Sequence, residues 1–154
     1  MVLGLGLSLA PIGAYLVVTG HFAILPLFFS LAVLCWVSGF DIIYALQDED
    51  FDRGEKLHSI PTRLGRVNAL RLSTFLHVLS AIFVILPVFF THVSWPYCAG
   101  LLVFCAMLIY QHRLVHPDDL SRVNFAFMTT NGIASVVFAL FFLLDRVWIH
   151  QTII

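Results

Sequence analysis

The stretch LPLFFSLAVLCWVSGFDIIYAL, residues 25–46, decides the fold, because Asp41 is its one charged residue in 22 positions. A helix needs about 20 mostly apolar residues to cross the roughly 30 Å of hydrocarbon in a bilayer. Runs of the same kind lie near residues 1–19, 70–90, 95–113 and 123–144. The sequence therefore predicts about five membrane-spanning helices.

The composition agrees with a membrane protein. The chain is 60% hydrophobic and only 11% charged, which lies outside the usual range for a soluble domain. Strands of a membrane barrel would alternate polar and apolar residues, whereas these runs are apolar on all sides. We expect an all-α integral membrane fold with one domain over residues 1–154. The net charge of −1 gives no support for nucleic-acid binding, which calls for a basic surface.

Lysine and arginine concentrate in two of the connections between the runs. Short cytoplasmic loops of membrane proteins collect these residues, and the two connections fall on the same side of a five-helix chain. We therefore expect a multi-pass protein of the cytoplasmic (inner) membrane with both connections on the cytoplasmic side, and Arg146 alone disagrees. The basic residues of the two connections are Arg53, Lys56, Arg63, Arg66 and Arg71, then Arg113 and Arg122.

The first basic connection is also strongly acidic. At about 100° per residue, a helix continuing beyond Phe40 would place three carboxylates and a phenol on one face. Like charges one turn apart repel, and acids at a helix C-terminus oppose the helix dipole. Residues that break local rules in this way indicate a functional site. The four residues on this face are Asp41, Tyr44, Asp48 and Asp52.

A divalent cation would turn this repulsion into attraction. Mg²⁺ commonly takes one or two carboxylates and completes its coordination with water and substrate phosphate. We expect Asp48 and Asp52 to be the metal ligands. Lys56, Arg63 and Arg66 follow directly and could bind the remaining phosphate oxygens.

The acidic stretch is also compatible with a purely structural role, as a solvated loop whose acids pair with its own basic residues. An EF-hand calcium loop fits poorly, because Arg53 and Ser59 stand where its glycine and glutamate belong. The seven histidines are scattered over the chain, and we expect no histidine metal site.

Two segments carry a family resemblance. GFDIIYALQDEDFDRGEKLHSIPTRLG, residues 39–65, resembles the second aspartate-rich motif of the UbiA family of membrane prenyltransferases. YQHRLVHPDDLSRVNFAF, residues 110–127, is similar to the stretch before the last helix in the quinone-biosynthesis branch. The resemblance implies helices five to nine of a nine-helix bundle, the C-terminal half. The family's first motif, N-D-x-x-D-x-x-x-D, is nowhere in the 154 residues.

The resemblance also implies an activity. In this family Mg²⁺ assists transfer of a polyprenyl group from polyprenyl diphosphate to an aromatic acceptor such as 4-hydroxybenzoate, in ubiquinone or menaquinone biosynthesis. It makes Asp48 and Asp52 the metal-binding pair, and places Asp41 and Tyr44 in the catalytic cavity near the acceptor or diphosphate. Lys56 is expected to bind the diphosphate together with Arg63.

Because the first motif is missing, we expect this chain alone to be inactive. Its origin would be a truncated or split gene product, or an excerpt of a longer chain. A separate chain with the first motif would then complete it. Two further classes of protein compete with this interpretation: a small cation carrier subunit with Asp41 as the ion site, and a non-catalytic membrane scaffold. A carrier site should lie near mid-bilayer, whereas these acids cluster at one border.

Overall fold

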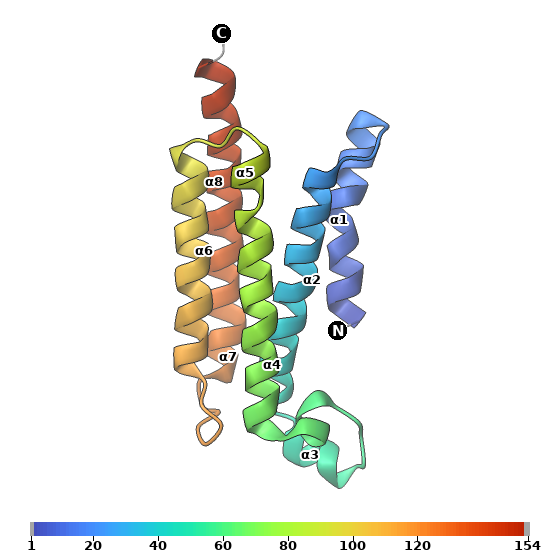
Figure 1. The fold of residues 1–154 in the computed structure, drawn as a ribbon. Coiled ribbons are helices and arrows are strands. Elements are labelled where there is room, and N and C mark those ends of the chain that lie inside the picture. The colour runs from blue at the N-terminus through green and yellow to red at the C-terminus, as the bar shows by residue number, and fades with distance from the viewer. Residues whose placement is uncertain (1, 153–154) are drawn as a thin grey trace.

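The structure is a computed structural model that describes residues 2–152. In this range, five apolar helices form the bundle, and short helical segments join them (Figure 1). The long helices are α1 (Val2–Thr19), α2 (Ile24–Ala45), α4 (Ile60–Ile85), α6 (Trp95–Leu114) and α8 (Asn131–Thr152). The short segments are α3 (Glu49–Gly54), α5 (Pro87–Phe90), α7 (Val123–Phe125) and the π-helical η1 (Ala126–Thr130).

The predicted all-α membrane fold is confirmed. Four helical segments of the described chain are long and apolar enough to cross a membrane, and α1 supplies a shorter apolar helix at Leu3–Thr19. The third run was expected near 70–90, but its helix begins ten residues earlier, at Ile60. A capping box starts it there, because the Ser59 N–H donates to Thr62 Oγ1 (3.0 Å) and Ser59 Oγ accepts from the Thr62 N–H (3.4 Å).

Each long helix packs against particular neighbours. α1 lies against α2, α2 against α4, and α6 against α8 (Figure 1). Figure 1 shows α3 and its loops at one end of the bundle, the end at which the α6–α7 connection also lies. The two connections rich in lysine and arginine therefore share one end.

Small and polar residues hold α4 close to α2. Three α4 side chains at successive turns bond to backbone oxygens of α2, which is a common way for helices to associate in membranes. A Cβ on Gly39 would lie 2.4 Å from the His77 ring, so the approach requires glycine there. The three contacts are Ser73 Oγ to Gly39 O (2.7 Å), His77 Nε2 to Trp36 O (3.2 Å) and Ser80 Oγ to Ala32 O (2.9 Å).

One buried cluster fixes the end of the bundle that carries the acidic stretch. Ile42, Ile43 and Leu46, at the end of α2, pack with Ala69 and Leu70 of α4. The ends of α6 and α7 complete the same cluster. This packing therefore holds the last turn of α2 in place, and the acidic stretch starts from a fixed position.

The opposite end is held by an ionic contact. The fully buried Asp145 of α8 accepts hydrogen bonds from Ser94 N–H (2.7 Å) and Ser94 Oγ (2.6 Å), at the start of α6. Arg146 pairs with the same carboxylate and donates to His92 O (3.1 Å). Arg146 was the exception to the predicted sidedness, and this pairing offsets its charge.

Candidate functional site at the end of α2

The chain breaks its helix between the two parts of the acidic stretch. Residues 46–48 make i→i+3 hydrogen bonds with N···O distances of 3.1–3.3 Å before α3 begins. The prediction of one continuous helical face is therefore wrong, because such tight turns advance the chain by about 120° per residue instead of 100°. Asp41 and Tyr44 lie on α2, whereas Asp48 and Asp52 belong to α3.

Asp48 and Asp52 flank the first turn of α3. Asp48 is the exposed N-cap residue, and its backbone oxygen accepts from the Asp52 N–H at 2.8 Å. Asp52 is half-buried. Within residues 2–152, the ion pairs of this stretch involve Glu49 and Asp50, and none is found at Asp48 or Asp52. These two carboxylates remain available to a cation.

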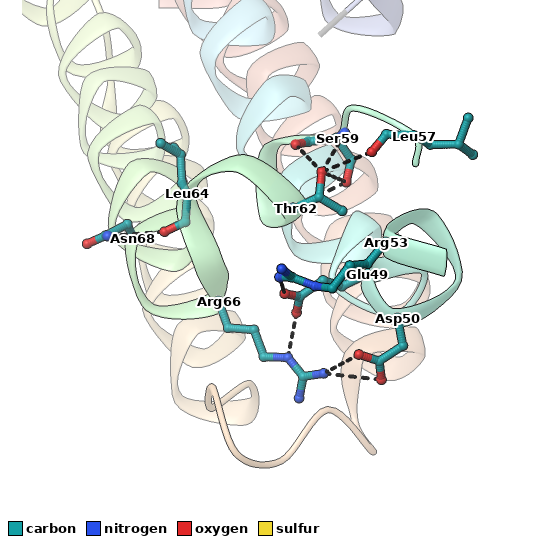
Figure 2. Close-up of polar contacts among 9 residues, drawn as sticks. All are labelled: Glu49, Asp50, Arg53, Leu57, Ser59, Thr62, Leu64, Arg66 and Asn68. Carbon is teal, nitrogen blue, oxygen red and sulfur yellow. Dashed lines mark hydrogen bonds and ion pairs between the residues drawn. The ribbon is translucent and has the colours of Figure 1, made fainter. Parts of the chain in front are cut away.

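Glu49 lies at the centre of a charge cluster that joins α3 to α4 (Figure 2). Its side chain is only 6% exposed, and its oxygens accept from Arg53 at 2.7 Å and from Arg66 at 2.6 Å. A second nitrogen of Arg66 reaches both Asp50 oxygens, at 3.3 and 3.4 Å. The hydrogen bond from Arg66 is the main cause of a lowered Glu49 pKa; burial opposes it, and Arg53 adds to it. Glu49 is therefore ionised at neutral pH.

The interpretation of the stretch as a self-paired loop holds for part of it. Glu49 and Asp50 are paired with basic residues of the same connection. Arg66 was expected to bind phosphate, but its guanidinium group is engaged by these two acids. Sequence reasoning missed Glu49, although its spacing of four residues from Arg53 was a usable signal.

The two residues expected to bind diphosphate lie on either side of the α3–α4 connection. Lys56 has a left-handed backbone (φ 55°) at the end of α3. The Leu57 N–H bonds to Asp52 O (2.7 Å) and the Lys56 N–H to Arg53 O (3.4 Å), which is a Schellman cap. Arg63 is exposed on the first turn of α4.

A kink in α4 sets the direction of Arg66. Gly65 has φ 76° and ψ 162°, a backbone conformation that essentially only glycine adopts. Arg66 follows immediately, and Figure 2 shows its side chain reaching from α4 toward Glu49 and Asp50 of α3. Gly65 therefore allows the turn that brings α4 and α3 into ionic contact.

Aromatic rings lead away from this site along α2. Tyr44 is 40% exposed, and its ring centroid lies 4.4 Å from that of Phe127 in the π-helical η1. Successive ring contacts of 5.3 to 5.8 Å continue the path into the bundle. The path runs through Tyr44, Phe127, Phe40, Trp36, Phe104 and Phe138.

The aromatic path ends at an apolar cavity of about 540 Å³ between α1, α2 and α8. Phe138 is common to the path and the cavity wall. Tyr15 of α1, Phe29 of α2 and Phe142 of α8 also line it. Its walls are suited to a hydrocarbon chain and supply almost no polar partner.

Asp48 and Asp52 supply carboxylate oxygens, which are the donor type that Mg²⁺ prefers. In the described part of the chain, no three His, Cys, Asp or Glu side chains converge as a complete protein site. Mg²⁺ usually keeps several waters and takes one or two carboxylates plus substrate phosphates. Asp48 and Asp52 match this partial donor set.

Two histidines that are far apart in the sequence meet in the bundle. His77 Nδ1 lies 2.8 Å from His112 Nε2, and His112 Nδ1 lies 3.3 Å from Thr74 Oγ1. Because Trp36 O can only accept, the His77 Nε2 carries the hydrogen, so His77 Nδ1 accepts from His112. The spacing in sequence gave no signal for this contact, which depends on how α4 and α6 pack.

The fold and this site together define a multi-pass helical membrane protein with an acidic motif at one end of the bundle and an apolar cavity within it. Residues 1–144 match the UbiA prenyltransferase family, and the chain belongs to this family. No solved structure matches the chain.

Two curated relatives carry a more specific name. The chain is 28% identical over 109 residues to a 4-hydroxybenzoate octaprenyltransferase of Aeromonas hydrophila subsp. hydrophila, covering 71% of this chain and 38% of the relative. It is 26% identical over 129 residues to the enzyme of the same name from Methylobacillus flagellatus, covering 81% and 42%. The chain therefore spans about two fifths of the length of these relatives.

Proposed function

We propose that this chain forms part of a Mg²⁺-dependent prenyltransferase that transfers a polyprenyl group from polyprenyl diphosphate to an aromatic acceptor resembling 4-hydroxybenzoate. Such a reaction belongs to ubiquinone or menaquinone biosynthesis. The observation that carries the proposal is the division of the acidic stretch: Glu49 and Asp50 are neutralised by arginines, whereas Asp48 and Asp52 are left to bind a cation. Family membership and the two relatives support the reaction class.

The acidic and basic residues have different roles in binding the diphosphate. Asp48 and Asp52 would hold Mg²⁺, which would neutralise charge on the diphosphate and improve it as a leaving group. Lys56 and Arg63 bind the remaining oxygens as cationic donors. The carbon–oxygen bond of the donor breaks with its electron pair passing to the diphosphate. A ring carbon of the acceptor then forms the new carbon–carbon bond and loses its proton.

The aromatic path and the cavity receive the hydrocarbon parts. Tyr44 and Asp41 lie on the last turns of α2. We expect them to lie near the acceptor or the diphosphate. Aromatic faces attract cations by about 0.5–2 kcal/mol each, so the rings near Tyr44 favour the allylic cation that ionisation produces. The cavity of about 540 Å³ accommodates part of the polyprenyl chain.

This chain supplies one side of the proposed site. Metal ions shared between two acidic motifs would stabilise the diphosphate from both sides, and half of the ligands would support little ionisation. We infer that the chain alone is inactive and acts with a separate segment that carries the first motif. The distribution of lysine and arginine supports the cytoplasmic side of the inner membrane for α3.

The test is prenyl transfer by the chain co-expressed with a segment that carries the first motif. Asp48→Asn and Asp52→Asn should each abolish transfer from geranyl diphosphate to 4-hydroxybenzoate, and should leave the thermal midpoint unchanged or slightly higher because a repulsion is removed. Glu55→Gln is the matched control, since it removes one negative charge from the same stretch at an exposed residue. Near-normal transfer in both variants would contradict the metal role.

A further inference from the structure

We propose that Glu49 is a positioning residue for the metal site: its carboxylate fixes α3 to α4 and so sets the direction of Asp48 and Asp52. The contact itself is observed in the ion pairs with Arg53 and Arg66. The inference that this contact orients the metal ligands rests on the proposed function.

The helix α3 is too short to hold its own position. It has six residues, too few for an isolated helix to be stable in water, so its place depends on contacts with the rest of the chain. Glu49 is the buried residue among these six. Its contact with Arg66 crosses 17 positions of sequence and joins α3 to the kinked start of α4.

The ionic contact also determines the direction of the metal ligands. Glu49 directly follows Asp48, and Arg53 directly follows Asp52, so the carboxylate pair and the ionic pair lie on neighbouring faces, about 100° apart. When the ionic pair is held against α4, the direction of the carboxylate pair is therefore set as well. Rotation of α3 about its own axis would move both Asp48 and Asp52 away from a shared cation.

An ionic contact is better suited to this task than an apolar one. An apolar contact is non-directional, and a buried ion pair seldom adds more stability than a well-packed apolar one. Arg66 donates through Nε to Glu49 and through a terminal nitrogen to Asp50, which fixes both the position and the rotation of the short helix. The charge cluster therefore serves orientation.

The experiment uses the chain assembled with a segment that carries the first motif, in lipid nanodiscs. Mn²⁺ and inorganic diphosphate are the probes, read by electron paramagnetic resonance. Glu49→Gln should weaken diphosphate-dependent Mn²⁺ binding by about tenfold or more, the size expected for groups that orient metal ligands. Gly65→Ala should also weaken it without changing any charge, because alanine disfavours the conformation that directs Arg66. Glu55→Gln is the control, with the same charge change at an exposed residue.

Hydrogen exchange of residues 49–55 and the thermal midpoint are measured on each variant. Faster exchange in α3 together with weaker Mn²⁺ binding and an intact bundle is the expected result. The inference is overturned if Glu49→Gln leaves the wild-type Mn²⁺ binding unchanged. It is also overturned if Glu55→Gln lowers this binding as much as Glu49→Gln does. Unfolding of the bundle in both the Glu49 and Gly65 variants also overturns it, since the contact would then serve the fold. Absence of any wild-type signal contradicts the proposed function instead.

Discussion

Lys56 stands where a helix ordinarily ends in glycine. Its left-handed backbone closes the Schellman cap of α3, and a residue with a Cβ is disfavoured there by about 1–2 kcal/mol. Strained residues cluster at functional sites, where the surrounding structure holds them in place. A cationic side chain beside the acidic turn is consistent with the diphosphate role proposed for Lys56.

Replacement of Lys56 by glycine separates these two effects. Lys56→Gly should raise the unfolding free energy by about 1 kcal/mol, because the backbone strain is relieved, and should weaken Mg²⁺-dependent diphosphate binding. Lys56→Arg keeps the charge and should retain the binding. Thermal melts and diphosphate titrations measure the two quantities. Undiminished diphosphate binding by the glycine variant would remove Lys56 from the proposed site.

Among the structural elements, hydropathy predicted the long helices but not the structure of the polar segments at their ends. The apolar runs predicted α2, α6 and the bundle class, because spanning the membrane depends on length and composition. The break before α3 was missed, since it arises from three local turns that no residue type at 46–48 dictates. The ionic contact of Glu49 with Arg66 and the His77–His112 contact were also missed, because both depend on packing between distant segments.

The contact between α3 and α4 should depend on pH through Glu49. The Glu49 pKa is lowered from an ordinary value of 4.5, so folding favours its ionised form. The stabilisation is therefore complete above pH 4.5 and is lost as the pH falls through the lower, folded-state pKa. Hydrogen exchange of α3, corrected for its intrinsic pH dependence, should show loss of protection in that acidic range. Glu49→Gln should show no such transition, and an unchanged acid transition in this variant would assign it to another group.

The α2–α4 interface offers a separate prediction. Gly39→Ala places a Cβ 2.4 Å from the His77 ring and should lower the unfolding free energy by about 1–3 kcal/mol, as overpacking usually does. Gly132→Ala in α8 is the control, because a Cβ there meets nothing within 4 Å. Thermal unfolding in detergent micelles compares the two. Equal midpoints for both variants would show that α2 and α4 do not approach as closely as described.

For the molecule as a whole, the chain provides a bundle with one acidic motif, an aromatic path and an apolar cavity, and it spans about two fifths of the length of its curated relatives. The proposed function depends on Asp48 and Asp52 binding Mg²⁺ together with an isoprenoid diphosphate. Calorimetric titration of geranyl diphosphate into the chain assembled with a segment that carries the first motif tests it most directly. We predict binding that requires Mg²⁺ and disappears in the Asp48→Asn and Asp52→Asn variants. Binding that is equal with and without Mg²⁺, or unchanged in both variants, would contradict the account.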